Sequence, residues 1–258
     1  MEKNFEKKIS VDIILPNYNK FDFLEESIES VVNQTFKTWH LYIIDDCSGD
    51  NSSSIIKKFS NHSNISSILL KKNMGPSFCR NYAIRISKSE YISFIDSDDT
   101  WEKTKLQKQI NFMEKNDLNF TYTDYRPFFQ EKEKKVYKEK TSLKNYFDFE
   151  SFTKNSSINT TTMIIKRSIL KNLKFKKIKL MEDYLFKCRL LRNGNSAQKL
   201  NESLATYRIL NKSRSSMRLK NLYWLWYINK NYNKFNFFKN LISVIFISIN
   251  SIKKYGIK

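Results

Sequence analysis

Short apolar segments alternate with segments of helical periodicity four times within the first 115 residues. The strands expected from this pattern are residues 11–15, 39–44, 65–70 and 91–95. The helices expected after them are residues 24–32, 52–59, 76–86 and 101–113, the third beginning at Pro76. An alternation of this kind predicts an α/β fold built on a mostly parallel sheet.

Three of the expected strands run directly into polar or acidic residues. These residues are 16–19, 45–46 and 96–99. Open α/β sheets bind their ligands beyond the carboxyl ends of the strands, so we expect the three segments to meet at one edge. Their meeting point would be the ligand-binding site of the protein.

Within the last of these segments, Asp96 and Asp98 are two residues apart. Carboxylate oxygens at this spacing suit a hard divalent cation such as Mg²⁺ or Mn²⁺, which keeps open positions for phosphate oxygens. An acidic turn that caps the following helix would have the same sequence. The spacing alone leaves both interpretations open.

Other side chains have chemistry that suits a nucleotide ligand. The acidic pair at 45–46 could accept hydrogen bonds from a base or a ribose, and Tyr18 could stack on a base. Arg80 could approach a phosphate. The carboxylates at 182–183 could supply a general base, a role worth about 10²–10⁴ in rate. Ordinary turn, capping and surface roles would explain each of these residues equally well.

The composition excludes several classes of site. With only His40 and His62, a Ser-His-Asp hydrolase is not expected. The four glycines form neither a dinucleotide-binding fingerprint nor a P-loop, so phosphate charge would have to be met by a metal and by Lys or Arg. The three cysteines fit neither a disulfide framework nor a metal site, which predicts a reducing cytoplasm. We expect neither a signal peptide nor a membrane-spanning segment.

The second half of the chain is less regular and more basic. Residues 1–100 carry 12 Lys and Arg against 14 Asp and Glu, whereas residues 101–258 carry 34 against 12. The elements expected here are a charge-rich loop at 131–140, a strand at 159–165, a helix at 182–191, a strand at 204–209 and aromatic-rich helices from 215 onward. The uncharged stretch 240–252 could lie in a membrane interface or pack as a core helix, and both remain open.

Five motifs in residues 9–101 resemble those of family 2 glycosyltransferases, in the same order. They are VDIILPNYN (11–19), SVVNQTF (30–36), IIDDCS (43–48), NMGPS (73–77) with Arg80 and Asn81, and FIDSDDTW (94–101). Downstream, MEDY (181–184) resembles the acceptor motif of the family, and Tyr207-Arg208 with Ser213 resembles a later element. The resemblance implies a GT-A fold, a Rossmann-like central sheet flanked by helices, here with a helical C-terminal extension.

The resemblance also implies roles for individual residues. The expected contacts of the donor nucleotide, usually a UDP-sugar, are Pro16, Tyr18, Asn19, Asp46, Arg80 and Asp96. Asp98 would bind a Mn²⁺ or Mg²⁺ ion that bridges the diphosphate. Asp183 would take the proton of the acceptor hydroxyl in an inverting transfer. The expected contacts of the acceptor or the diphosphate are Asp99, Trp101, Glu182 and Arg208. Arg208, Lys212 or Arg214 would close over the diphosphate as a mobile loop.

Partners and domain limits follow from the same resemblance. The acceptor would be a saccharide or a polyprenyl-diphosphate-linked saccharide in bacterial surface polysaccharide synthesis, of the O-antigen, capsule or teichuronic acid type. The sequence has no Q-x-x-R-W element, which favours transfer of a single sugar. We expect a catalytic domain over 1–212, with a nucleotide-binding half at 1–115 and an acceptor half at 116–212, and a basic, aromatic helical extension over 213–258. The protein would be cytoplasmic, with the basic second half available for peripheral contact with the inner face of the membrane.

Three other functions compete with this interpretation. A sugar-phosphate nucleotidyltransferase shares the α/β plan and an acidic metal site, but usually has a Gly- and Arg-rich loop where this chain has residues 16–20. A non-catalytic basic module that binds nucleic acid would place Lys and Arg among aromatics on one surface, and the acidic first half argues against it. We therefore expect no nucleic-acid partner. An inactive glycosyltransferase-like scaffold is the third.

Overall fold

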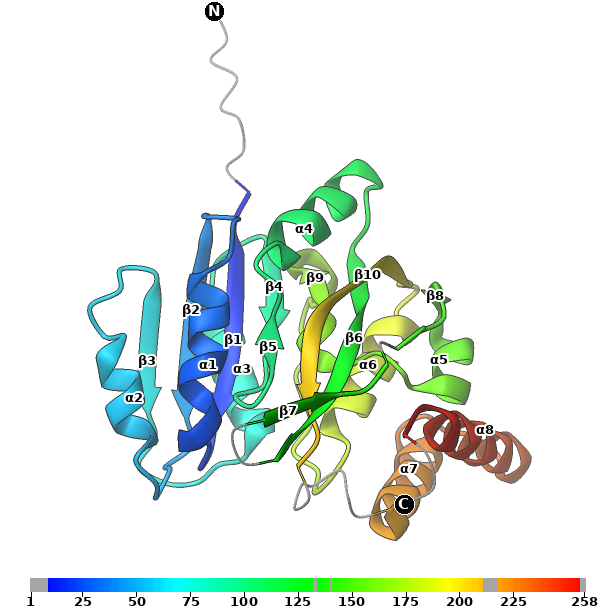
Figure 1. Cartoon of the computed structure of the whole chain (residues 1–258). Coiled ribbons are helices and arrows are strands. Elements are labelled where there is room, and N and C mark those ends of the chain that lie inside the picture. The colour runs from blue at the N-terminus through cyan, green and yellow to red at the C-terminus, as the bar shows by residue number, and fades with distance from the viewer. Residues whose placement is uncertain (1–8, 132–133, 140, 211–217, 256–258) are drawn as a thin grey trace, which may run out of the picture.

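The computed structural model describes residues 9–131, 134–139, 141–210 and 218–255. Within them, ten strands form one sheet in the order β3-β2-β1-β4-β9-β6-β10-β5, with β7 paired to β6 and β8 to β10 (Figure 1). The strands are β1 (Val11–Asn17), β2 (Trp39–Asp45), β3 (Ile65–Leu69), β4 (Tyr91–Phe94), β5 (Thr100–Trp101), β6 (Phe120–Glu131), β7 (Lys134–Tyr137), β8 (Tyr146–Phe147), β9 (Ile164–Lys166) and β10 (Ala197–Arg208). The helices are α1 (Phe21–Val32), α2 (Ser52–Lys58), α3 (Pro76–Ile86), α4 (Lys105–Lys115), α5 (Phe149–Asn155), α6 (Glu182–Arg192), α7 (Arg218–Asn231) and α8 (Phe237–Tyr255), with single 3₁₀ turns η1 (Thr160–Thr162) and η2 (Arg167–Ile169).

The first half of the sheet is parallel, as predicted. β1 pairs in parallel with β2 on one side and with β4 on the other, and β2 pairs in parallel with β3. In Figure 1, α1 and α2 lie in front of these strands and α3 lies behind them. Both faces of β1 are therefore covered, which explains why its apolar residues run on without alternating with polar ones.

The second half joins the same sheet with mixed polarity. β9 lies antiparallel between β4 and β6, and β10 runs parallel to β6 and antiparallel to β5. The sheet is thus continuous from the expected nucleotide-binding half into the expected acceptor half. The predicted fold class, a mostly parallel α/β sheet flanked by helices, is confirmed. The expected boundary between residues 212 and 213 lies outside the described residues.

Three local predictions were wrong. The strand expected over 159–165 is a 3₁₀ turn, η1, followed by β9, which begins only at Ile164. The helix expected over 101–113 begins at Lys105, because Thr100 and Trp101 form β5 and pair with the end of β10. The loop expected over 131–140 contains β7, which forms an antiparallel pair with the end of β6. Packing of Tyr137 against Phe128, with ring centroids 5.4 Å apart, accompanies this pairing in spite of the high local charge.

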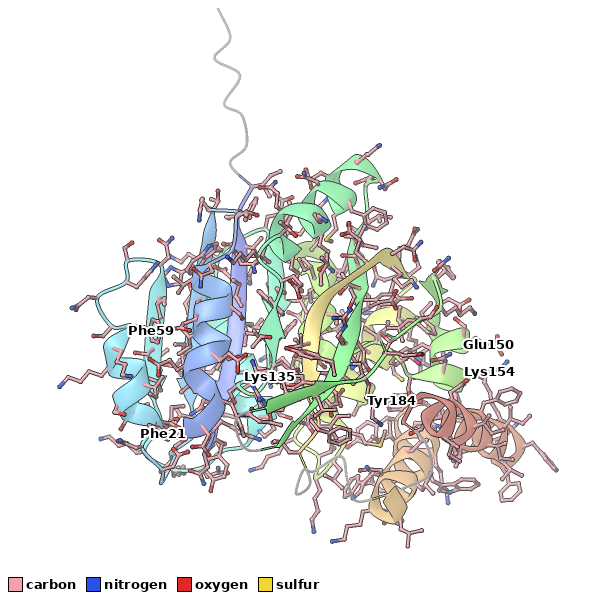
Figure 2. The ribbon with its side chains drawn as sticks, in the orientation of Figure 1. Phe21, Phe59, Lys135, Glu150, Lys154 and Tyr184 are labelled. Carbon is pink, nitrogen blue, oxygen red and sulfur yellow. The ribbon has the colours of Figure 1, made fainter. Side chains whose placement is uncertain are left out.

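The C-terminal helices α7 and α8 pack on each other, and α8 also packs on α5. Figure 1 shows this pair beyond α5 and α6, apart from the sheet. Tyr184 of α6 lies where that helix faces the pair, and its hydroxyl donates to Asn229 Oδ1 of α7 at 2.9 Å (Figure 2). No helix in the described part of the chain combines the length and the apolarity that a bilayer crossing requires.

Candidate active site

The carboxyl ends of β1, β2 and β4 bring the three predicted segments together. Asn17 stands opposite Asp45 in the β1–β2 pair, and its Nδ2 donates to Asp45 Oδ1 at 2.7 Å. Lys20, just after β1, forms an ion pair with Asp98 Oδ2 at 2.7 Å. Segments 16–20, 45–46 and 96–99 therefore form one site at one edge of the sheet.

The loop after β1 is fastened to the loop after β2. The Asn19 amide donates to Ser48 Oγ at 3.0 Å, and the Gly49 amide donates to Asn19 Oδ1 at 2.8 Å. Asn19 has a φ of 51°, a left-handed conformation that Asn tolerates better than most residues. Pro16 is half-buried in β1, whereas 48% of Tyr18 is exposed. The ring of Tyr18 is thus presented at the rim of a fixed loop.

Asp46 fixes the start of α3. Its side chain is buried, and its Oδ1 and Oδ2 accept the amides of Met74 and Gly75 at 2.6 and 2.8 Å. Gly75 takes a φ of 85°, which glycine adopts without strain, and Pro76 occupies the first turn of the helix. The carboxylate therefore sets the position of the helix that carries Arg80.

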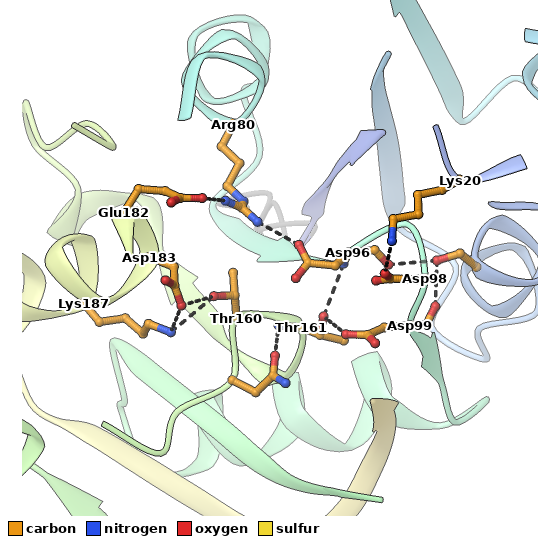
Figure 3. A network of polar contacts seen from close by, with 12 residues as sticks. Lys20, Arg80, Asp96, Asp98, Asp99, Thr160, Thr161, Glu182, Asp183 and Lys187 are labelled. Carbon is orange, nitrogen blue, oxygen red and sulfur yellow. Dashed lines mark hydrogen bonds and ion pairs between the residues drawn. The ribbon is translucent and has the colours of Figure 1, made fainter. Parts of the chain in front are cut away.

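Arg80 connects the end of β4 with the start of α6. Its Nη2 lies 2.7 Å from Asp96 Oδ1, and its Nη1 lies 3.5 Å from Glu182 Oε1 (Figure 3). The guanidinium carbon lies 5.4 Å from the centre of the Phe175 ring, and the residue is only 5% exposed. Arg80 Nε has no hydrogen-bond partner among the described residues, so a buried donor is left over in the site.

Asp98 is the residue predicted to bind a metal. Burial raises the pKa of Asp98, the Lys20 ammonium opposes this rise, and the nearby Asp96 carboxylate adds to it. In the part of the chain that the structure describes, no three or more His, Cys, Asp or Glu side chains gather to hold a metal by themselves. Asp96 and Asp98 offer only oxygens. Such ligands fit a hard divalent cation such as Mg²⁺ or Mn²⁺.

Asp99 is fully buried and joins distant parts of the chain. Its Oδ1 accepts the Arg208 amide at 3.0 Å, and its Oδ2 accepts the Thr161 hydroxyl at 2.6 Å. Burial raises the pKa of Asp99 well above its usual value, and the Asp98 and Asp96 carboxylates raise it further. Asp99 thus ties the acidic turn to η1 and to the end of β10.

Arg208 lies behind the acidic turn. Its Nε donates to the Asp98 main-chain carbonyl at 2.9 Å, and its Nη2 lies 2.8 Å from Glu26 Oε2. The guanidinium is fully buried, with its carbon 4.4 and 4.5 Å from the ring centres of Phe23 and Phe128. These contacts hold the side chain under the turn. Lys212 and Arg214, expected to close beside it, lie outside the described residues.

Thr161 holds both ends of the acidic turn. Its hydroxyl accepts the Asp96 amide at 3.2 Å and donates to Asp99, and its carbonyl accepts Trp101 Nε1 at 2.9 Å. Trp101 is thereby buried beside the turn. The Asn159 side chain in turn accepts the Thr161 amide at 2.9 Å, which positions η1.

Asp183, the predicted base, lies in the first turn of α6. Lys187, one turn further along, places its Nζ 2.8 Å from Asp183 Oδ2, and the Thr160 hydroxyl lies 3.4 Å from the same oxygen. Burial by itself would raise the pKa of Asp183, but the charges of Lys187 and Arg80 outweigh it and lower the pKa to about 2. The side chain is 41% exposed, so this ionised carboxylate remains reachable from solvent.

Three contributors to the site were not predicted. Lys20 directly follows the first motif, and Lys187 stands at the i+4 position of Asp183, where a cation supports a carboxylate on a helix. Both residues could have been predicted from the sequence, Lys20 from its place next to a motif and Lys187 from its i+4 spacing to Asp183. Lys187 is almost fully buried and also donates to the Ile158 carbonyl at 2.7 Å. Thr161 lies in a run of three threonines that carried no such signal.

Comparisons with known proteins agree with this geometry. The model of Glycosyl transferase family 2 matches residues 12–174. Bacillus subtilis TuaG, whose name assigns it to teichuronic acid biosynthesis, is 30% identical over 95% of this chain and 96% of its own. Escherichia coli WfgD and WfaP are 31% and 34% identical over 84% and 82% of this chain, and 83% and 82% of their own. Both are named UDP-Glc:alpha-D-GlcNAc-diphosphoundecaprenol beta-1,3-glucosyltransferases.

Solved structures share the fold. S. aureus TarS 1-349 in complex with UDP-GlcNAc has a TM-score of 0.72 at 20% identity, over 96% of this chain and 73% of that chain. The mannosyltransferase PcManGT from Pyrobaculum calidifontis, in complex with GDP-Man and Mn²⁺, has a TM-score of 0.68 at 14% identity, over 96% and 76%. With sequence relatives that match nearly from end to end and a family model that covers most of the sheet, this chain is a glycosyltransferase and belongs to family 2.

Proposed function

We propose that this enzyme moves one sugar, with inversion, from a UDP-sugar to a lipid-linked or free saccharide in bacterial surface polysaccharide synthesis. The observation that carries the proposal is the Arg80 bridge, which links Asp96 at the expected donor site to Glu182 beside the expected base. The names of the relatives WfgD and WfaP specify a UDP-Glc donor and a diphosphoundecaprenol-linked acceptor. The name of TuaG specifies teichuronic acid.

On the donor side, the proposed nucleotide contacts divide into two groups. Tyr18 would stack on the base from the exposed rim, next to Pro16 and Asn19. Arg80 and Asp96 would contact the nucleotide deeper in the site. There Arg80 Nε is a buried donor without a hydrogen-bond acceptor among the described residues, so a nucleotide oxygen could accept from it. Asp46 would act on the base while it also fixes the turn before α3.

The diphosphate would lie over Asp98. Asp98 would hold a divalent cation, which would supply positive charge to stabilise the leaving diphosphate. Lys20 already neutralises Asp98 and would compete with a free cation for it. Lys20 would also lie close enough to contact phosphate once the donor is bound.

On the acceptor side, Asp183 would act as general base. Its carboxylate would take the hydroxyl proton of the acceptor as that oxygen forms a bond to the anomeric carbon. The bond from that carbon to the diphosphate would break, and UDP would leave with the electron pair. Lys187 and Thr160 hold one carboxylate oxygen, which orients the base.

The remaining predicted residues would support the site. We propose that Asp99, buried within the acidic turn, and Trp101 and Arg208, buried against it, hold the turn in place. Glu182 would orient Arg80. The division into a nucleotide-binding half (1–115), an acceptor half (116–212) and a C-terminal extension (213–258) is proposed with it.

A donor screen tests the proposal. With Mn²⁺ present, one or more UDP-sugars should yield free UDP, and UDP should raise the melting temperature more than GDP does. UDP release is measured by a coupled assay, and unfolding by differential scanning fluorimetry. Faster turnover of GDP-mannose than of every UDP-sugar would contradict the assignment of the donor.

Lys187→Met should narrow the pH range of the enzyme. Lys187 and Arg80 hold the pKa of Asp183 at about 2, so the wild-type base is ionised down to low pH. Without the Lys187 charge the pKa of Asp183 rises, and a carboxyl group with a higher pKa is protonated sooner on acidification. The acidic limb of kcat/KM should therefore shift to higher pH.

The matched control is Lys154→Met. Lys154 also pairs with a carboxylate at the start of a helix, Glu150, at 3.5 Å, but this pair lies on α5, away from the site (Figure 2). Its pH profile should match that of the wild type. An unchanged acidic limb in Lys187→Met would remove the proposed influence of Lys187 on the base.

A further inference from the structure

The last helix of the described chain turns its apolar side chains outward. Seven residues on one side of α8 share this property, each at least 39% exposed: Phe238, Leu241, Ile242, Ile245, Phe246, Ile249 and Ile252. Their spacing of three and four places them on one face of the helix. Residues 240–252, which carry six of these seven side chains, include no charged residue.

The side of α8 that packs on the protein buries Ile247 but is otherwise rich in polar residues. Asn240 Nδ2 donates to the Trp226 carbonyl at 3.0 Å, and Asn250 Nδ2 donates to the Lys154 carbonyl at 3.2 Å. Ser243 Oγ donates to the Thr153 carbonyl at 2.5 Å. A surface helix ordinarily buries its apolar stripe and exposes its polar one. Here most of the apolar side chains of α8 are exposed instead, so this face suits an apolar environment outside the chain.

Aromatic side chains border this face. The Trp226 ring of α7 meets the Phe237 ring at the start of α8 edge-on, with centroids 5.5 Å apart, and Tyr223 of α7, three residues before Trp226, is 62% exposed. Trp and Tyr combine an apolar body with a polar tip and are enriched where a membrane meets water. The border of the face thus has the chemistry of the lipid headgroup region.

The positive charge around the face favours an anionic bilayer over a second copy of the chain as its partner. Residues 203–258 contain 11 Lys and Arg and no Asp or Glu. Four lysines of this region are exposed on or beside the helical pair: Lys220, Lys230, Lys234 and Lys239. Two copies brought together at this face would repel each other, whereas each Lys or Arg near an anionic bilayer contributes about 1 kcal/mol of attraction.

We propose that the outward face of α7 and α8 docks on an anionic lipid bilayer. α8 would lie flat in the interface with its seven apolar residues among the acyl chains, while its polar side keeps the hydrogen bonds to α5 and α7. This proposal does not depend on the assigned chemistry of the active site. It would place the enzyme at the surface where a lipid-linked acceptor resides.

The test measures binding of the full chain to sedimented vesicles. Phosphatidylglycerol vesicles at about 0.1 M salt should bind the protein, phosphatidylcholine vesicles should bind it more weakly, and about 1 M salt should weaken the anionic binding. Ile245→Asn with Phe246→Ser should lower the partition coefficient at least about tenfold, since two apolar side chains are removed. Leu69→Ser with Val136→Ser is the control, because both residues are exposed strand residues away from this face.

Three results would overturn the proposal. In the first, the wild type does not bind phosphatidylglycerol vesicles at low salt. In the second, the Ile245/Phe246 variant binds them as well as the wild type does. In the third, the wild type is a dimer, the variant is a monomer, and neither binds vesicles. An unchanged melting temperature, expected for exposed positions, would show that the variant is folded. Hydrolysis of UDP-sugar in solution should be the same in the variant and the wild type. If the wild type hydrolyses no UDP-sugar, that result contradicts the proposed function but not the proposed docking surface.

Discussion

Asp183→Asn is expected to lower kcat by about 10²–10⁴ and to leave the affinity for UDP unchanged. Asparagine has the same shape and can accept a hydrogen bond from Lys187, so the start of α6 should persist. Its amide cannot take a proton from the acceptor hydroxyl. The measurement pairs kcat at saturating donor and acceptor with the dissociation constant of UDP from calorimetry. Transfer at the wild-type rate would remove Asp183 as the base.

The control for this variant is Glu150→Gln. Glu150 and Lys154 repeat the arrangement of a carboxylate and a lysine one turn later, outside the site. Its kcat should equal that of the wild type. Glu182→Gln provides a comparison inside the site, because Glu182 pairs with Arg80. We expect that change to act through the KM of the donor more than through kcat.

Asp98→Asn is expected to lower kcat/KM by about 10³, since a cation that stabilises a leaving diphosphate is worth several kcal/mol. The variant should also lose the extra thermal stabilisation that Mn²⁺ and UDP give together. In the wild type, Mn²⁺ alone should stabilise little, because Lys20 already occupies Asp98. Excess EDTA should reduce wild-type activity to the level of the variant and have little further effect on the variant.

The control for Asp98→Asn is Asp22→Asn. Asp22 is an exposed carboxylate in the first turn of α1, two residues after Lys20, and the site does not use it. Its removal changes the net charge by the same amount. Full wild-type activity in excess EDTA would eliminate the metal role of Asp98. Equal losses in the two variants would assign the effect to general electrostatics.

The parallel half of the fold could be predicted because its signals are local. Each apolar run in residues 11–95 is long enough for one strand and is followed by a helix of matching period. Pro76 marked the start of α3 for a purely local reason, its fixed φ. The motifs at the strand ends then located Asp96 and Asp98 at the shared edge.

The second half could not be predicted to the same degree because its strands depend on distant partners. β6 was not assigned at all, since Asp124 and Pro127 interrupt its pattern. The structure stabilises Asp124 through the Lys199 ammonium at 3.0 Å, from a residue 75 positions away. Likewise, Thr161 acquires its role only when β9 and η1 lie beside β4. No window of neighbouring residues contains that information.

The pairing of Arg208 with Asp98 and Asp99 has a consequence for biosynthesis. A chain emerging from the ribosome contains the whole acidic turn once residue 99 has been made, yet the Arg208 amide that donates to Asp99 arrives 109 positions later. Domains fold from the N-terminus during synthesis, so a nascent chain would carry a parallel sheet whose acidic turn still lacks the contacts of Arg208. The acidic turn would gain these last contacts only when β10 enters between β6 and β5. The α7–α8 face follows β10 in the chain, so a protein that reaches the bilayer would already hold a finished site.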